Sequence, residues 1–281
     1  MLVFDSPATM TAWSASQQLA GRRVGLVPTM GALHHGHVAL IGEAQRSCDV
    51  VVVSIFVNPL QFNRRDDFDR YPRPGQGDLD VCAANGVDAV YAPTAEAMYP
   101  PGFDTHVEIG RLAETLEGAG RPGHFRGVAT VVAKLFNAVR PHIAVFGEKD
   151  FQQLAVINQM VNDLDMAITI VAVRTEREAD GLAMSSRNQR LTSLQRDAAV
   201  VVPAAIEAVK AAFVGGNCNA HELCQIATNV VSIEPFARLE YVDLVDPHTL
   251  QHINTVNDST RVVIAVWFDD IRLIDNAALS D

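Results

Sequence analysis

The segment His34-His35-Gly36-His37 places three imidazoles within four residues. It follows the apolar run 24–28 and precedes a stretch with helical spacing, so the histidines should lie at the start of a helix. A helix N-terminus presents unpaired N–H groups and a partial positive charge, which favour phosphate, and imidazoles there can donate hydrogen bonds to it. The pattern predicts a nucleotide site in which His34 and His37 contact phosphate and Gly36 allows close approach.

A second interpretation of the same histidines stays open. His35 and His37, one residue apart after a first strand, could be the metal pair of a zinc-dependent hydrolase. Such a site needs further ligands after later strands. The available histidines lack convincing spacing for this role; they are His106, His124 and His142.

Two further segments carry groups suited to a small hydroxy acid and to phosphate. Asn58 and Gln61 follow the continuously apolar run 50–57, and their amides offer both donors and acceptors to a carboxylate and hydroxyls. Lys149 follows Gly147, where another apolar run breaks, and its ammonium would neutralise phosphate charge. In an acidic chain, such cations must be concentrated where an anionic substrate binds.

A compact anion-binding surface is predicted at Ser185-Ser186-Arg187, where two hydroxyls precede a guanidinium. Arginine can bind phosphate through two parallel hydrogen bonds. The surrounding stretch 179–188 resembles the mobile Lys-Met-Ser-Lys-Ser loop of nucleotidyl-transferring enzymes, with Arg187 as the cation.

The elements that hold these segments alternate between strand and helix. Strands are expected at 24–28, 50–57, 87–91, 142–146 and 167–173, and helices at 7–21, 38–46, 78–85, 127–140 and 151–164. This order predicts a doubly wound parallel sheet, in which ligands bind outside the carboxyl ends of the strands. Beyond it, helices are expected at 193–213 and 221–231, and strands at 239–245, 261–268 and 271–273. The expected fold is α/β, with a Rossmann-like doubly wound parallel sheet (1–175) and a smaller C-terminal α+β domain (176–281).

The composition narrows the class of protein. The chain has 281 residues, a formal net charge of -11 and 48% hydrophobic residues, which fits a packed globular protein. Its acidity argues against general binding to nucleic acid or anionic membranes. Four cysteines without a Cys-x-x-Cys pair predict reduced thiols. No apolar run is long enough to span a bilayer, and the first basic residue is Arg22, unlike a signal peptide, so we expect a cytoplasmic protein.

Two common nucleotide-binding patterns are excluded. The stretch 118–123 matches G-x-G-x-x-G, but it follows no strand-like run and has Pro122 where the helix of a dinucleotide motif should open. The P-loop pattern G-x-x-x-x-G-K-S/T does not occur. If the protein binds ATP, the histidine segment 34–37 is the remaining candidate for the phosphate-binding motif.

Taken in order, four segments resemble those of the pantothenate synthetase family, within the His-x-Gly-His nucleotidyltransferase superfamily. The similarity extends over nearly the whole chain. The segments lie at 28–34, 56–62, 146–153 and 180–188, and the stretches 71–73 and 121–128 fit as well.

The resemblance implies an ATP-dependent ligase that joins (R)-pantoate to β-alanine. Pantoate would first form pantoyl adenylate with release of pyrophosphate, and β-alanine would then displace AMP to give pantothenate. The resemblance also implies a requirement for Mg²⁺, a homodimer, and a C-terminal domain that acts as a lid.

The same resemblance assigns residues to roles. Catalytic roles fall to His34, His37, Lys149 and Arg187, with His37 as proton donor, whereas His35 is expected to be a bystander. Contacts to ATP are expected from Met30, Gly31, Ala32, Leu33, His34, His35, Gly36, His37, Gly147, Glu148, Lys149, Asp150, Glu176, Met184, Ser185, Ser186 and Arg187. Gln61 and Gln153 are expected to bind pantoate, and Asn58 is expected to lie beside the incoming amine of β-alanine. Further substrate contacts are expected from the covering loop, at Tyr71, Glu117 and Arg121. No protein ligand to a metal is assigned.

One departure from the family pattern lies at Arg174-Thr175-Glu176-Arg177, where the family has proline, threonine, an apolar residue and arginine. Glu176 falls where a backbone contact to adenine is expected. Since a backbone contact does not depend on the side chain, ATP binding should persist, while the hinge geometry stays open.

Two other functions remain as alternatives to the ligase. One is a nucleotidyltransferase acting on a different small acid, and the other is a sensor that binds ATP without consuming it. The presence of both phosphate-binding cations and an amide-rich acid pocket argues against the sensor.

Overall fold

The computed structural model describes residues 1–280, and the chain forms two compact units. The N-terminal unit comprises residues 1–148 and 152–174. The C-terminal unit comprises residues 149–151 and the chain from Thr175 onward. The binding of ATP and pantoate by the domain 1–175 and the lid function of the domain 176–281 stay predictions.

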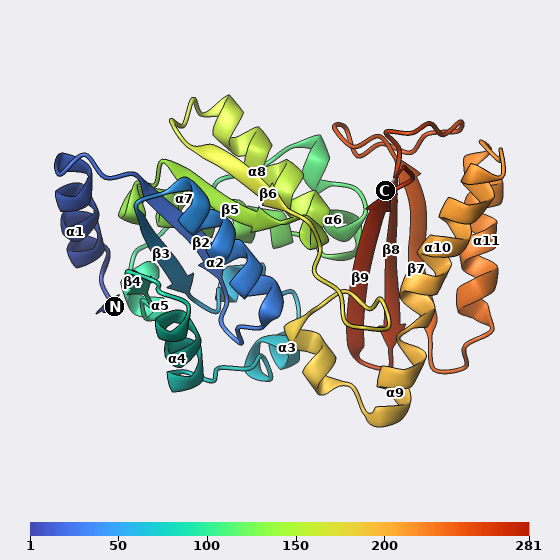
Figure 1. The fold of residues 1–281 in the computed structure, drawn as a ribbon, viewed down its shortest axis with the longest axis horizontal. Coiled ribbons are helices and arrows are strands. Elements are labelled where there is room, and N and C mark those ends of the chain that lie inside the picture. The colour runs from blue at the N-terminus through green and yellow to red at the C-terminus, as the bar shows by residue number, and fades with distance from the viewer. Residues whose placement is uncertain (281) are drawn as a thin grey trace. The chain divides into compact units, whose positions relative to one another are not determined.

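The N-terminal unit is built on a six-stranded parallel sheet in the order β1-β4-β3-β2-β5-β6 (Figure 1). Its strands are β1 (Leu2–Phe4), β2 (Val24–Thr29), β3 (Val50–Ile55), β4 (Ala89–Tyr91), β5 (Ile143–Gly147) and β6 (Thr169–Val173). The chain order reverses direction at β2, which pairs with β3 on one side and β5 on the other. The predicted doubly wound parallel sheet is confirmed, and its switch point lies between β2 and β5.

Both faces of this sheet are covered, which explains the continuously apolar strands. In β3, Val50 and Val52 pack into one cluster, whereas Val51 and Val53 pack into another on the opposite face. The first cluster is covered by helices α1 (Pro7–Leu19), α7 (His124–Val139) and α8 (Phe151–Asp163), and the second by α2 (His35–Ser47) and α4 (Gln76–Ala84).

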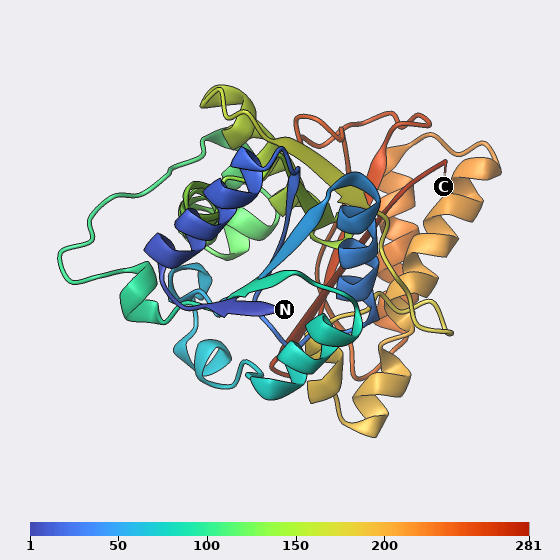
Figure 2. The ribbon, with the colours of Figure 1, turned by 60° about the vertical axis from the view of Figure 1, so that its left-hand side comes forward.

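The helices and strands predicted for this unit exist, with shifted ends. The strand predicted at 50–57 ends at Ile55, because the chain turns into the short 3-10 helix η1 (Pro59–Gln61), which Asn58 caps. The short elements were not predicted; they are β1, α3 (Arg65–Asp69), α5 (Ala95–Met98), η2 (Arg111–Ala113) and α6 (Glu117–Gly120). A long irregular segment follows α5 and loops away from the sheet (Figure 2).

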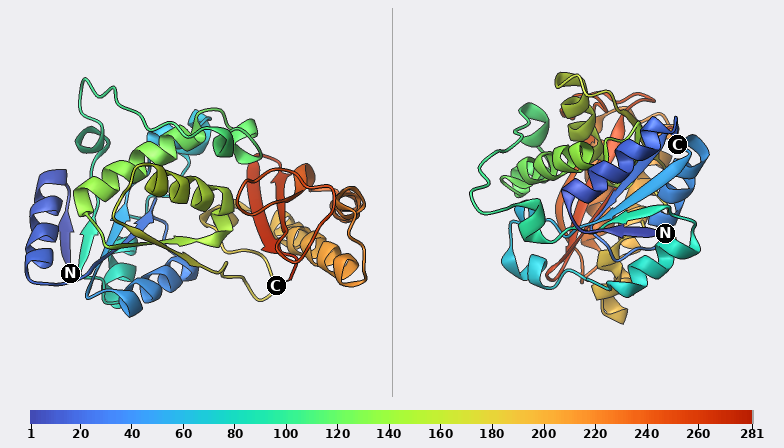
Figure 3. Two further views of the ribbon diagram at one scale, coloured as in Figure 1. Left: turned by 90° about the horizontal axis from the view of Figure 1, so that it is seen from above. Right: turned by 90° about the vertical axis from the view of Figure 1, so that its left-hand side faces the viewer.

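The C-terminal unit contains a three-stranded antiparallel sheet of β7 (Arg238–Val245), β8 (Arg261–Phe268) and β9 (Ile271–Ala278), with helices packed beside it (Figure 3). The single helix predicted at 193–213 is wrong: it is divided into α9 (Ser193–Ala198) and α10 (Val201–Val214), followed by α11 (Ala220–Ser232). Pro203 has no N–H to donate into a continuous helix, so it is accommodated in the first turn of a new one.

Strand β9 is longer than the predicted 271–273. Its extension contains Asp275 and Asn276, which are both only 3% exposed. Buried polar residues break the apolar pattern that sequence reading relies on, and they are tolerated here because they are hydrogen bonded. Arg177 pairs with Asp275 at 2.6 Å, and Arg261 Nε donates to Asn276 Oδ1.

Candidate active site

The histidine segment forms the start of α2, directly after the central strand β2. His34 caps the helix, and its Nδ1 accepts a hydrogen bond from the Gly36 N–H at 3.2 Å. In return, the His34 N–H donates to Nδ1 of His37 at 3.2 Å. The two rings lie side by side, 4.1 Å between centroids. This reciprocal arrangement is a capping box built from two imidazoles.

The capping box determines which ring nitrogen of each histidine carries the proton. A neutral imidazole has one acceptor and one donor nitrogen. Since both Nδ1 atoms accept main-chain hydrogen bonds, the proton of each neutral ring lies on Nε2. His34 and His37 are thus fixed as Nε2–H donors at a helix N-terminus, as a phosphate site requires. His35 is exposed and takes no part in this capping box.

The loop before these histidines is held by Asp78, a residue not predicted from the sequence. Its carboxylate is 2% exposed and accepts the N–H groups of Ala32 at 3.0 Å and Leu33 at 2.8 Å. The loop needs this support because Ala32 has a φ of 52° and Gly31 a φ of 85°. A Cβ on Gly31 would also lie 2.7 Å from Asp78 Oδ2. Asp78 lies in the first turn of α4, far from any strand end in the chain, and no sequence motif marks it.

The predicted acid-binding amides lie at the carboxyl end of the neighbouring strand β3. Asn58 is 1% exposed and Gln61 is 8% exposed. Gln61 Nε2 donates to Met30 Sδ at 3.1 Å, which brings the loop after β3 against the loop after β2. The residues predicted to bind nucleotide and acid in these two loops are therefore adjacent.

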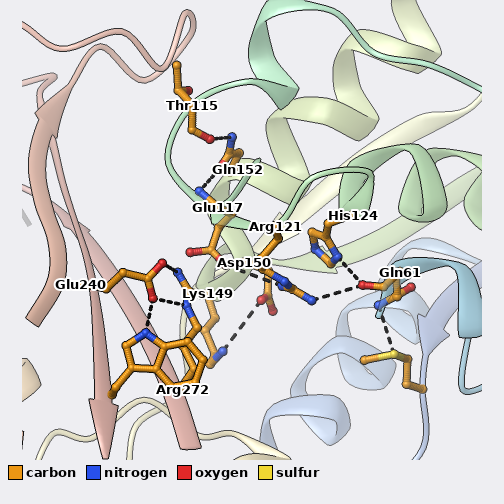
Figure 4. Close-up of polar contacts among 12 residues, drawn as sticks. Gln61, Thr115, Glu117, Arg121, His124, Lys149, Asp150, Gln152, Glu240 and Arg272 are labelled. Atoms are coloured by element: carbon orange, nitrogen blue, oxygen red, sulfur yellow. Dashed lines mark hydrogen bonds and ion pairs between the residues drawn. The ribbon is translucent and has the colours of Figure 1, made fainter. Parts of the chain in front are cut away.

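The backbone of Gln61 is fixed by two side chains from the segment before and within α7 (Figure 4). His124 Nδ1 lies 2.7 Å from the Gln61 carbonyl oxygen and must carry a proton, since a carbonyl only accepts. Arg121 donates to the same oxygen at 3.3 Å and lies 3.6 Å from the carboxylate of Glu117. Arg121, predicted as a substrate contact, thus supports Gln61.

The loop that carries Glu117 is anchored by Gln152, which is 5% exposed (Figure 4). Gln152 Nε2 donates to the carbonyls of Leu112 and Thr115, both at 2.8 Å, and its Oε1 accepts the Glu117 N–H at 2.9 Å. The next residue, Gln153, is half-buried in α8. Sequence reasoning singled out Gln153 and overlooked the structural task of Gln152.

The remaining predicted residues of the N-terminal unit lie close to the same strand ends. Tyr71 is 6% exposed and packs edge-on against Phe62, with 5.6 Å between centroids. Gly147 ends β5 and Glu148 follows it, across the switch point from the loop after β2.

The other predicted phosphate-binding residues belong to the C-terminal unit. Lys149 Nζ lies 3.8 Å from Asp150 Oδ1, and the Lys149 carbonyl accepts a hydrogen bond from Asn276 Nδ2 at 2.9 Å. Ser185 caps the 3-10 helix η4 (Ser186–Arg190) by accepting the Arg187 N–H at 3.2 Å. Ser186 is 7% exposed.

The loop around Ser185 is held by charged residues. Arg196 donates to Glu178 at 2.6 Å and lies 2.7 Å from Asp180, and these contacts raise the pKa of Arg196, the Glu178 hydrogen bond most of all. Asn188 donates to Glu178 at 2.8 Å and to the Ala183 carbonyl at 3.1 Å.

Elsewhere in the C-terminal unit, Glu240 on β7 accepts two hydrogen bonds from Arg272 on β9 (Figure 4).

The unusual Glu176 has an exposed side chain, and its carbonyl accepts the Met184 N–H at 2.9 Å. This hydrogen bond and the Arg177–Ala183 bridge give the segment 176–184 the form of a narrow hairpin. These contacts are made by main-chain atoms, so they do not depend on the side chain at position 176.

Within residues 1–280, no group of three or more histidine, cysteine, aspartate or glutamate side chains could hold a metal ion. The zinc interpretation of His35 and His37 therefore has no ligand set in the described chain. None of the helices described in residues 1–280 has the length and apolar character to cross a membrane. The four cysteines are all free in the structure.

Known proteins resemble this chain from end to end. A family model described as Pantoate-beta-alanine ligase matches residues 2–278. The pantothenate synthetase of Heliobacterium modesticaldum is 49% identical over 276 residues, 98% of each chain. That of Geotalea uraniireducens is 45% identical over 281 residues, 100% of each chain.

Solved structures agree with these sequence matches. The crystal structure of pantothenate synthetase from Thermus thermophilus has a TM-score of 0.95 and 42% identity, covering 100% of both chains. Pantoate-beta-alanine ligase from Francisella tularensis, complexed with Beta-gamma ATP and beta-alanine, has a TM-score of 0.84 and 34% identity, covering 100% of this chain and 98% of that one. Fold, motif order and full-length similarity agree, and this chain belongs to the pantoate–β-alanine ligase family.

Proposed function

We propose that this enzyme condenses (R)-pantoate with β-alanine at the expense of ATP, forming pantothenate, AMP and pyrophosphate. The observation that supports it best is the 3.1 Å contact between Gln61 Nε2 and Met30 Sδ. It joins a loop suited to a small hydroxy acid to a loop suited to nucleotide phosphate. A carboxylate at the first loop would therefore lie close to the phosphates at the second.

The first step is the attack of a pantoate carboxylate oxygen on the α-phosphorus of ATP. A phosphorus–oxygen bond forms, the bond to the β-phosphate breaks, and pyrophosphate leaves with the electron pair. Negative charge moves onto the leaving phosphates, where the Nε2–H groups of His34 and His37 and the helix N-terminus stabilise it. Adenylation is needed because hydroxide is too poor a leaving group for direct condensation.

In the second step the β-alanine amine attacks the carbonyl carbon of pantoyl adenylate. AMP leaves with the electron pair of the carbon–oxygen bond, and the amine loses a proton as the amide forms. No covalent intermediate with the protein is required, so catalysis rests on alignment and on stabilisation of phosphate charge.

The roles of individual residues follow the family resemblance and are part of this proposal. The residues that bind the triphosphate are His34, His37, Lys149, Ser185, Ser186 and Arg187. The adenosine is positioned by Met30, Gly147 and Asp150, and the backbone at Glu176 contacts the adenine. Pantoate binds Gln61 and Gln153, with Asn58, Tyr71 and Arg121 supporting that pocket.

Magnesium fits this scheme as part of the substrate, because ATP phosphates supply oxygen ligands for it. The enzyme therefore uses Mg·ATP, and no dedicated set of protein side chains holds a further ion. By the same family resemblance we propose a homodimer that works in the cytoplasm.

The test is release of AMP by the purified protein with pantoate, β-alanine, ATP and Mg²⁺, followed by a coupled assay. AMP should form only when both pantoate and β-alanine are present. AMP no higher than in the single-substrate controls would refute the proposal. Pyrophosphate exchange with another small acid, and none with pantoate, would point to the alternative nucleotidyltransferase.

The His37→Ala variant tests the phosphate role within that assay. Loss of one charge-stabilising donor should lower kcat by about 100-fold or more, with His221→Ala, an exposed histidine on α11, as the matched control. A His37→Ala enzyme with wild-type turnover would contradict the role. Equal losses from His35→Ala and His37→Ala, together with stoichiometric zinc, would favour the metal-pair hypothesis.

A further inference from the structure

Tyr99, the residue after α5, makes a hydrogen bond that links it to the acid-binding loop. Its hydroxyl lies 2.7 Å from Asn58 Oδ1. The ring packs against Phe103 and Phe56, with centroids 4.9 and 6.0 Å away, so the hydroxyl is held in place by aromatic contacts. The sequence offered no motif at Tyr99.

The amide of Asn58 can adopt only one orientation. Its Oδ1 accepts the Leu60 N–H at 3.3 Å, and its Nδ2 donates to the Gly127 carbonyl at 3.1 Å. These backbone partners cannot exchange the roles of donor and acceptor, so the oxygen and nitrogen of Asn58 are assigned without ambiguity. Tyr99 must therefore be the donor in its bond to Oδ1.

The orientation of Asn58 in turn sets that of Gln61. The second N–H of Asn58 Nδ2 donates to Gln61 Oε1 at 3.0 Å. The Gln61 oxygen therefore accepts this hydrogen bond from Asn58. The NH₂ group of Gln61 lies on the other side of the amide, where Nε2 contacts Met30. All four hydrogen-bonding positions of Asn58 are used within the described chain: two donors and two acceptor lone pairs.

We propose that Tyr99 is a positioning residue for pantoate, acting through Asn58 on Gln61. This inference rests on the proposed function, since it takes pantoate as the ligand of Gln61. The chain of hydrogen bonds makes Gln61 a donor to the substrate, which suits a carboxylate or hydroxyl oxygen and would not suit an amine. It also gives Asn58 a supporting role in place of a direct contact to β-alanine.

The charge state of Tyr99 is compatible with this role. Burial raises the pKa of its hydroxyl, so the group stays protonated at neutral pH and remains a donor. The Lys134 ammonium lies 5.9 Å from the centre of the Tyr99 ring, over its face.

The test is Tyr99→Phe, which removes only the hydroxyl. Tyr91→Phe is the matched control, because the buried Tyr91 hydroxyl has no hydrogen-bond partner within the described residues. Loss of a neutral hydrogen bond corresponds to roughly a fivefold to tenfold effect. Tyr99→Phe should raise the KM for pantoate by about that factor and leave the KM for ATP unchanged, whereas Tyr91→Phe should change neither.

A double-mutant cycle with Gln61→Ala separates positioning from general loosening of the fold. If Tyr99 acts through Gln61, the effect of Tyr99→Phe on the KM for pantoate disappears in the Gln61→Ala background. A Tyr99→Phe enzyme that matches Tyr91→Phe, or an effect that persists in full without Gln61, would overturn the inference. A wild-type protein that makes no AMP with pantoate would instead refute the proposed function itself.

Discussion

The two units hold their candidate site segments by different means. In the N-terminal unit, Asp78, Asn58 and Gln152 anchor the loops, and as whole residues they are 2%, 1% and 5% exposed. In the C-terminal unit, the loop around Ser185 is held by Arg196, Glu178 and Asp180, whose side chains are 28%, 32% and 38% exposed. One region uses buried hydrogen bonds and the other uses half-exposed ion pairs.

The difference has an energetic consequence. A buried polar group that loses its partner costs about 1–3 kcal/mol, whereas a solvent-screened ion pair contributes about 0–1 kcal/mol. The loops of the N-terminal unit should thus be preorganised for pantoate and phosphate, and the Ser185 loop should rearrange at little cost. Such freedom would suit a loop that binds and releases nucleotide, which is the role proposed for this segment.

The largest effect is expected at Asp78. Asp78→Asn places an NH₂ group against the N–H of Ala32 or Leu33, so a buried donor loses its acceptor. At about 1–3 kcal/mol, kcat/KM should fall by about 10- to 100-fold, measured by steady-state kinetics beside thermal unfolding. Asp80→Asn, an exposed position on the same helix, is the control. Wild-type kinetics in Asp78→Asn would mean that the loop does not need this anchor.

An intermediate effect is expected where α7 touches the acid-binding loop. A Cβ on Gly127 would lie 2.3 Å from the Leu60 carbonyl oxygen and 2.7 Å from the Gln61 nitrogen. Gly127→Ala should therefore lower the free energy of unfolding by about 1–3 kcal/mol and raise the KM for pantoate, measured by chemical denaturation and kinetics.

Gly42→Ala is the control for this prediction, because only a flexible arginine end lies within 4 Å of its Cβ position, at 3.9 Å. Alanine there should increase stability by about 0.5–1 kcal/mol through helix propensity. A stabilising Gly127→Ala would show that the contact between α7 and the Leu60–Gln61 backbone is looser than described.

The smallest effect is expected in the C-terminal unit. Glu178→Gln removes the charge paired with Arg196 and should change the free energy of unfolding by less than about 1 kcal/mol. The KM for ATP should rise about twofold to fivefold, and high salt should reduce the difference from wild type because exposed charges are screened. Glu207→Gln, whose exposed side chain pairs with Lys210, is the control. If Glu178→Gln lowered kcat/KM as much as Asp78→Asn does, the two units would not differ in how strongly their loops are anchored.

Much of the fold and site could be predicted from local patterns. The run Val50–Val53 predicted a strand covered on both faces, and the two faces are indeed buried in separate clusters. His34 and His37 were predicted at a helix start, and they cap α2. Prediction failed where the local pattern and the tertiary structure disagreed. The stretch 193–213 has a uniform composition, but a new helix begins just before Pro203. The polar residues Asp275 and Asn276 interrupt the apolar pattern, so the end of β9 was missed.

The sequence by itself determined the residue types and their order: imidazoles after the first central strand, amides after the next, and cations farther along. It also determined the family. Only the tertiary structure decided which side chains support the others, because Asp78, Tyr99 and Gln152 act on loops 35 to 46 residues away in the chain. Buried hydrogen bonds of this kind depend on distance and orientation in space, and a linear spacing carries neither.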